Sequence, residues 1–102
     1  MLTEFDVRNE LSEIDGSDAH PIRKARQLIA VANRVRRQAY RLTEGARILS
    51  RDGNDEQAER LNLRKLRMHD LAHEILAHAR THLASSQRSA AQPETHAVRY
   101  VS

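Results

Sequence analysis

Apolar residues repeat every seven positions in two long segments of the chain. In the first segment alanine occupies one heptad position, and a larger aliphatic residue follows three positions later. The alanines are Ala25, Ala32, Ala39 and Ala46, and the larger residues are Leu28, Val35, Leu42 and Leu49. Such a repeat is typical of helices that pack against another helix over their whole length. We therefore predict a helix over residues 21–51.

The second segment repeats this pattern, so the two helices are expected to pair. Its members are Ala58, Ala72 and Ala79, with Leu61, Met68 and Ile75 three positions later; Lys65 interrupts the alanine series. The intervening residues, Asp-Gly-Asn-Asp at 52–55, favour a tight turn. Folding there would place Ala46 opposite Ala58 and Ala25 opposite Ala79. The sequence thus predicts an antiparallel helical hairpin with its second helix over residues 54–84.

Shorter segments flank the hairpin. Val7, Leu11 and Ile14 share one helical face, which indicates a short acidic helix within residues 1–16. Thr3 with Asp6 is close to a capping box, and Pro21 suits the first turn of the next helix. From residue 85 the chain is rich in Ser, Gln and Ala. We predict one helical domain over 1–84 and a flexible tail over 85–102, whose end at 96–101 could add to a partner as an edge strand.

Several apolar residues lie outside the heptad seam, and they favour self-association. We predict a fold of the all-α class, in which two hairpins would bury these residues by forming a four-helix bundle. For this homodimer interface we select Leu66, Leu71, Leu76 and Leu83. With its Ala/Leu layers, the hairpin over 21–84 resembles the dimeric hairpins of the Rop family of small RNA-binding plasmid-copy regulators. The resemblance implies architecture alone, because no functional motif is shared.

Composition narrows the class of protein. There are only three aromatic residues and no cysteine, so disulfides and thiolate chemistry are excluded. No apolar run approaches the length of a membrane span, and the acidic N-terminus does not resemble a signal peptide. We therefore expect a cytoplasmic protein with no membrane partner.

The charge is distributed unevenly along the chain. Residues 1–20 carry six acids and one arginine, whereas residues 21–51 carry nine basic residues and one acid. The candidate site for nucleic acid or another anionic partner, such as an acidic protein surface, is Arg23, Arg26, Arg34, Arg37, Tyr40, Arg41 and Arg47. Arginine favours forked contacts to phosphate, and the tyrosine could stack on a base. The alternatives are a solvated face, or pairing with the acids of the first helix.

The second half of the chain contains two pairs of histidines at helical spacing. His69 with His73, and His78 with His82, are each four residues apart, a spacing that can share a metal ion. No third ligand is specified by the pattern, so we expect no metal and no cofactor. A Gly-rich phosphate loop and a nucleophile elbow are both absent from the sequence, and no small-molecule substrate or enzymatic activity is expected.

Together these patterns predict a non-catalytic, dimeric helical regulator that contacts nucleic acid or another polyanion through an arginine-rich face. The alternative is an adaptor or inhibitor, of the kind that phages and mobile elements encode, which masks a surface of a larger protein.

Overall fold

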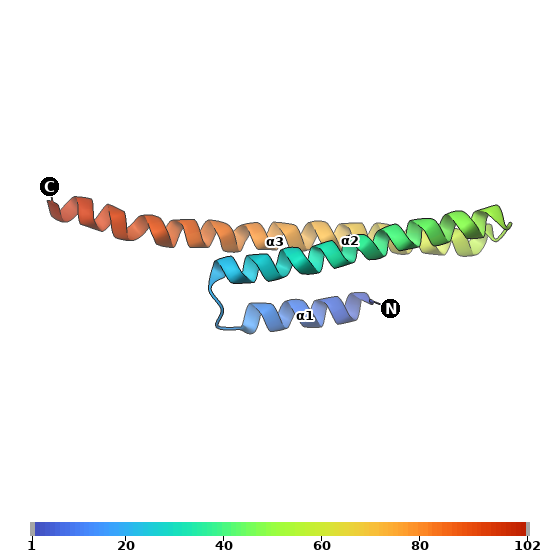
Figure 1. The fold of residues 1–102 in the computed structure, drawn as a ribbon, viewed down its shortest axis with the longest axis horizontal. Helices are drawn as coiled ribbons and strands as arrows, with labels where there is room; N and C mark the ends of the chain where they lie inside the picture. Colours follow the sequence, from blue (N-terminus) through green and yellow to red (C-terminus); the bar gives the residue numbers. More distant parts are fainter. Residues whose placement is uncertain (1, 102) are drawn as a thin grey trace.

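The computed structural model describes the backbone of residues 2–101 and the side chains of residues 2–88. It contains three helices: α1 (Glu4–Gly16), α2 (Pro21–Arg51) and α3 (Asp55–Val101). No strand occurs between residues 2 and 101, so the predicted all-α class is confirmed. Figure 1 shows α2 and α3 side by side in opposite directions, with α1 along one edge of the pair.

The hairpin turns where the sequence predicts, between Arg51 and Asp55. Gly53 has a φ of 85°, a backbone conformation that glycine adopts without steric cost. The amide of Asn54 donates to the carbonyl oxygen of Leu49 at 2.8 Å and closes the end of α2. The hydroxyl of Ser50 donates to Asp55 Oδ1 at 3.3 Å across the turn. These contacts set the register in which α3 returns along α2.

The heptad residues form the core between α2 and α3. Every alanine of the α2 series is buried, as are Leu28, Val35 and Leu42. Ala58, Ala72 and Ala79 of α3 are also buried, together with Met68 and Ile75. Small side chains in these layers let the helix axes approach while the larger residues fill the spaces between them. Gly45 is one such close approach, since a Cβ there would lie 3.2 Å from Leu61 Cδ1.

Helix α1 begins with the predicted capping box. The Asp6 amide donates to Thr3 Oγ1 at 3.2 Å, and the Thr3 amide donates to the Asp6 carboxylate at 3.4 Å. Val7 and Ile14 are buried against the hairpin. Val31 of α2 and Leu71 of α3 lie outside the heptad seam, yet both are buried in the same core. Helix α1 therefore covers one flank of the hairpin with its apolar face.

The predicted end of the third helix near residue 84 is wrong, because α3 continues to Val101. The predicted tail over 85–102 and the edge strand at 96–101 are replaced by helix as far as Val101. Ala, Gln and Arg together account for seven of the eighteen residues in 85–102, and all three favour helix. In Figure 1 this part of α3 runs past the start of α2.

Candidate functional site

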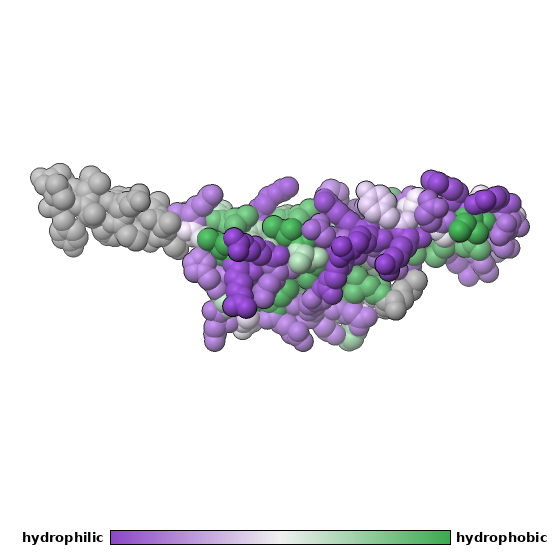
Figure 2. All heavy atoms as spheres, in the orientation of Figure 1, coloured by the Kyte–Doolittle hydropathy of each residue, from purple (hydrophilic) through white to green (hydrophobic). Residues whose placement is uncertain are grey.

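The arginine face comprises the predicted residues of α2, Arg23, Arg26, Arg34, Arg37, Tyr40, Arg41 and Arg47, and all of them are exposed. They alternate with the buried heptad residues and therefore lie on the side of α2 that faces away from α3. Tyr40 is 69% exposed between Arg37 and Arg41. Figure 2 shows hydrophilic side chains covering the middle of α2. The structure thus brings the predicted residues onto one solvent-facing surface.

Among residues 2–88, carboxylates neutralise only a small part of this charge. Arg34 forms an ion pair with Glu10 of α1. Arg47 pairs with Glu44 on its own helix at 3.2 Å. Within residues 2–88, no other arginine of this face lies within ion-pair distance of a carboxylate. Pairing with the acidic first helix therefore accounts for Arg34 and not for the remaining residues of the face.

The predicted dimer residues do not form one surface. Leu71 is only 3% exposed because it packs in the core of a single chain, so it is unavailable to a partner in this conformation. Leu76 is half-buried and packs against that core. Leu66 and Leu83 are exposed. The sequence interpretation placed Leu71 on the outside because the position of α1 was not known.

An apolar patch remains on the flank of the hairpin that α1 does not cover. We call it the open flank. In the register set by Ser50 and Asp55, residues of α2 at seven-residue intervals face residues of α3 at the same intervals. The members of the open flank are Ile22, Ile29, Leu76 and Leu83. Ile22, Ile29 and Leu83 are 37–40% exposed, and Figure 2 shows hydrophobic atoms gathered beside the first half of α2.

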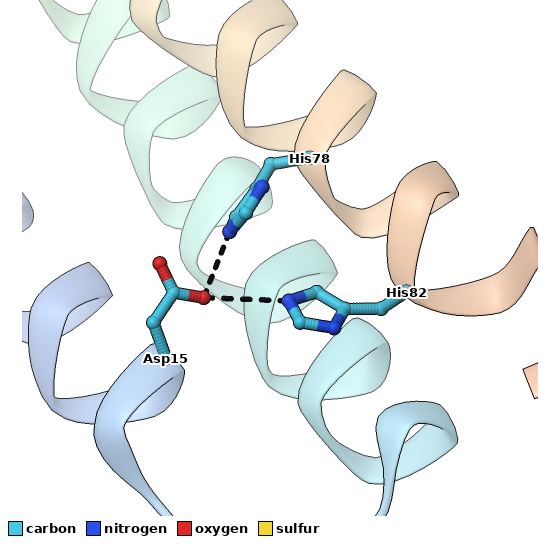
Figure 3. A group of neighbouring side chains, drawn as sticks. All are labelled: Asp15, His78 and His82. Atoms are coloured by element: carbon cyan, nitrogen blue, oxygen red, sulfur yellow. Dashed lines mark hydrogen bonds and ion pairs between the residues drawn. The ribbon is translucent and has the colours of Figure 1, made fainter. Parts of the chain in front are cut away.

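A second polar site lies where the end of α1 meets α3. We call it the Asp–His cluster: Asp15, His78 and His82 (Figure 3). Asp15 Oδ1 lies 2.8 Å from His78 Nε2 and 3.3 Å from His82 Nε2. The two rings meet edge to face with centroids 4.9 Å apart. Two histidines one helical turn apart on α3 therefore converge on a single carboxylate oxygen.

The environment of Asp15 favours its ionised form. Partial burial acts to raise the pKa of this carboxyl, but the hydrogen bonds from His78 and then His82 outweigh that effect. The pKa of Asp15 is therefore held below its ordinary value. Lys24 of α2 also reaches this end of α1, where its ammonium donates to the backbone oxygen of Asp15 at 3.0 Å.

A cavity of about 540 Å³ adjoins the cluster in the groove between α1 and α3. Leu11 and Ile75 give it an apolar floor, and Ser12, Thr81 and Glu74 supply polar groups. Arg8 at its edge contacts Glu4 at 3.1 Å and Glu74 at 3.3 Å. The hydrogen bond to Glu4 and the charge of Glu74 raise the pKa of Arg8, which remains a cation. Asp15, His78 and the cavity therefore form one continuous hollow.

Sequence reasoning identified both histidine pairs and missed Asp15. The spacing of His78 and His82 placed them on one helical face, but the carboxylate comes from a helix 63 residues earlier. Its position depends on the loop at 17–20, which turns α1 back along the hairpin. His69 and His73 have the same spacing, and no acidic side chain of the described residues joins them in a comparable group.

Comparison of the chain with models of protein families, with curated proteins and with solved structures finds no match. Across the part of the chain that the structure describes, no helix is both long and apolar enough to cross a membrane.

Proposed function

We propose that this protein is a non-catalytic binding protein whose arginine face contacts the phosphate backbone of a nucleic acid. One observation carries the proposal: Arg23, Arg26, Arg37 and Arg41 are exposed on one side of α2 and lie beyond ion-pair reach of every carboxylate in residues 2–88. Clustered, unneutralised arginines attract polyanions and make forked hydrogen bonds to phosphate.

The dimensions of the face suit a backbone contact. From Arg23 to Arg47, α2 extends about 36 Å at ~1.5 Å per residue. A duplex rises about 3.4 Å per base pair, so the face is as long as roughly ten base pairs. Tyr40, with 69% of its surface exposed at the centre of the face, is free to stack on an unpaired base.

Binding should be measured by fluorescence anisotropy with a random DNA duplex and with a structured RNA at two salt concentrations. Four phosphate contacts, one for each unpaired arginine, would weaken the affinity roughly 10²-fold between ~50 and ~200 mM salt, because condensed counterions are released on binding. No binding to either probe at ~50 mM salt would overturn the proposal.

A charge-matched pair of triple variants locates the contact. Arg26→Gln with Arg37→Gln and Arg41→Gln removes three charges from the arginine face and leaves Arg34 paired with Glu10. Arg60→Gln with Arg67→Gln and Arg80→Gln removes three charges from exposed positions of α3. The first variant should lose about three units of salt slope, whereas the second should bind nearly as the parent does. Equal losses in both would show that only net charge matters.

A second function is supported by the open flank. Exposed Ile22, Ile29 and Leu83 form an apolar surface at one end of the hairpin. We propose that a second copy of the chain covers it, since a two-fold axis would bury the same patch on both partners. A protein-masking adaptor would use the same surface, and its affinity would then depend on apolar substitutions and little on salt.

A further inference from the structure

We propose that Asp15, His78 and His82 form a zinc site that fastens the end of α1 to α3. The ligand atoms of these three side chains all lie within 4.8 Å of one another. Two of them are Nε2 atoms that already point at the same carboxylate oxygen (Figure 3). The Asp–His cluster shares no residue with the arginine face, so zinc binding does not depend on the proposed nucleic-acid binding.

The geometry is close to that of a metal site. Zinc bonds of about 2.0–2.2 Å to imidazole nitrogen and carboxylate oxygen require neighbouring ligand atoms about 3.2–3.5 Å apart in a tetrahedron. The two carboxylate–imidazole separations are 2.8 and 3.3 Å. All three ligand atoms lie within 4.8 Å of one another, so rotation of these partly exposed side chains has to bring them to the tetrahedral separation before they can share an ion.

The donor set selects the kind of ion. Two imidazole nitrogens and one carboxylate oxygen suit zinc and its neighbours in the first transition row, whereas magnesium and calcium prefer oxygen ligands alone. Three protein ligands leave a fourth position for water. Because His78 and Asp15 also line the 540 Å³ cavity, that position opens toward solvent.

The neighbouring charge and the exposure of the ligands determine how tightly the site should bind zinc. The ammonium of Lys24, held at the backbone oxygen of Asp15, is a positive charge beside the site and opposes cation binding. Three ligands from exposed or half-buried positions also bind more weakly than a closed four-ligand site. We expect this site to bind zinc more tightly than a single surface histidine does, because three ligands share the ion.

A second pair of histidines on α3 serves as the control for the proposed zinc site. His69 and His73 have the same four-residue spacing on the same helix, but they lack the carboxylate from α1. Changing either pair to glutamine removes two imidazoles and preserves helix propensity. Only the substitutions at His78 and His82 should reduce zinc binding.

The experiment is titration of the full chain, free of any histidine tag, with zinc chloride by calorimetry and with cobalt chloride by visible absorption. The parent should bind one zinc per chain, and the cobalt complex should show the intense absorption of a four-coordinate site. His78→Gln with His82→Gln should abolish this site, and Asp15→Asn should weaken it at least ~10-fold. Lys24→Met should strengthen it.

Two controls show whether a loss of zinc binding is specific to the Asp–His cluster: the other histidine pair and the helicity of each variant. His69→Gln with His73→Gln should bind zinc as the parent does, and circular dichroism should show that each variant keeps its helices. At the same zinc concentration, zinc should also raise the Tm of the parent more than that of Asp15→Asn, because an ion held by all three ligands bridges α1 and α3 and binds more tightly. Equal zinc binding by the parent and by His78→Gln with His82→Gln would overturn the proposal, as would an undiminished affinity in Asp15→Asn.

Discussion

The carboxylate of Asp15 accepts hydrogen bonds at 2.8 Å from His78 and at 3.3 Å from His82, and it thereby joins the end of α1 to the middle of α3. These contacts are partly exposed, since Asp15 and His78 each retain 44% of their side-chain surface. They add to the burial of Val7 and Ile14 in holding α1 against the hairpin.

Replacing Asp15 by Asn should therefore lower the stability of the metal-free protein modestly. Because its pKa is held low in the folded state, Asp15 contributes stability above its unfolded pKa of about 3.9, and this contribution is lost as the pH falls through the folded value. With half of the pair exposed to solvent, the loss at pH 7 should stay below ~1 kcal/mol. Urea unfolding in the presence of a chelator, from pH 7 to pH 3, would measure it.

Asp18→Asn is the matched control, because Asp18 is an exposed acid of the adjoining loop. The difference between the two variants should be present at pH 6–7 and should shrink as the pH falls through the folded pKa of Asp15. A difference that grows as the pH falls would contradict the assigned direction of the pKa shift.

The alanine layers should resist enlargement. Ala32 is completely buried between α2 and α3, so Ala32→Leu should cost about 1–3 kcal/mol by forcing the helices apart. Ala84→Leu places the same side chain at an exposed position and should change the free energy of unfolding by less than ~0.5 kcal/mol. Chemical denaturation of both variants would test the difference, and equal costs would mean that the Ala32 layer has room to expand.

The open flank should control self-association. Ile29→Glu puts a charge at its centre, whereas Ile48→Glu places the same charge at an exposed isoleucine near the turn, outside the patch. We expect sedimentation velocity to show a dimer for the parent and for Ile48→Glu, and a monomer for Ile29→Glu, because an unpaired charge cannot be buried at a two-fold interface. A parent that sediments as a monomer at high concentration would eliminate the dimer.

The ion pair between α1 and α2 should lower the affinity of the arginine face for nucleic acid. Glu10→Gln releases Arg34, so one additional phosphate contact should raise the affinity for nucleic acid at low salt and steepen the salt slope by about 0.9. Glu13→Gln removes the same charge from an exposed position of α1 and serves as the control. Anisotropy titrations would compare them, and an equal gain in both would attribute the effect to net charge alone.

The hairpin could be predicted because the residues that define it recur at regular intervals in the sequence. The alanine series and the Asp52–Asn54 turn define both helices and their register without reference to any other element. The position of α1 was not predictable in the same way, since it depends on the direction of a four-residue loop. Val31 and Leu71 were the available signal: both lie on the same flank outside the seam, and α1 buries both.

The end of α3 and the Asp–His cluster were missed for different physical reasons. Polar composition after residue 84 suggested a tail, although residues such as Gln, Arg and Ala sustain a helix without burying a face. Asp15 meets the histidines only after three elements have assembled, and no local spacing encodes a contact between residues 63 positions apart.

The tight turn between α2 and α3 also bears on the order in which the chain folds. Each heptad layer that forms beside Gly53 shortens the loop that the next layer must close, so the hairpin can zip outward from its turn with little entropy lost at each step. Helix α1 packs beside α2 and contacts His78 of α3, so we expect it to dock after these two helices have paired. Substitutions at Val7 should then accelerate unfolding and leave the folding rate almost unchanged, whereas those at Ala46 and Ala58 should slow folding itself.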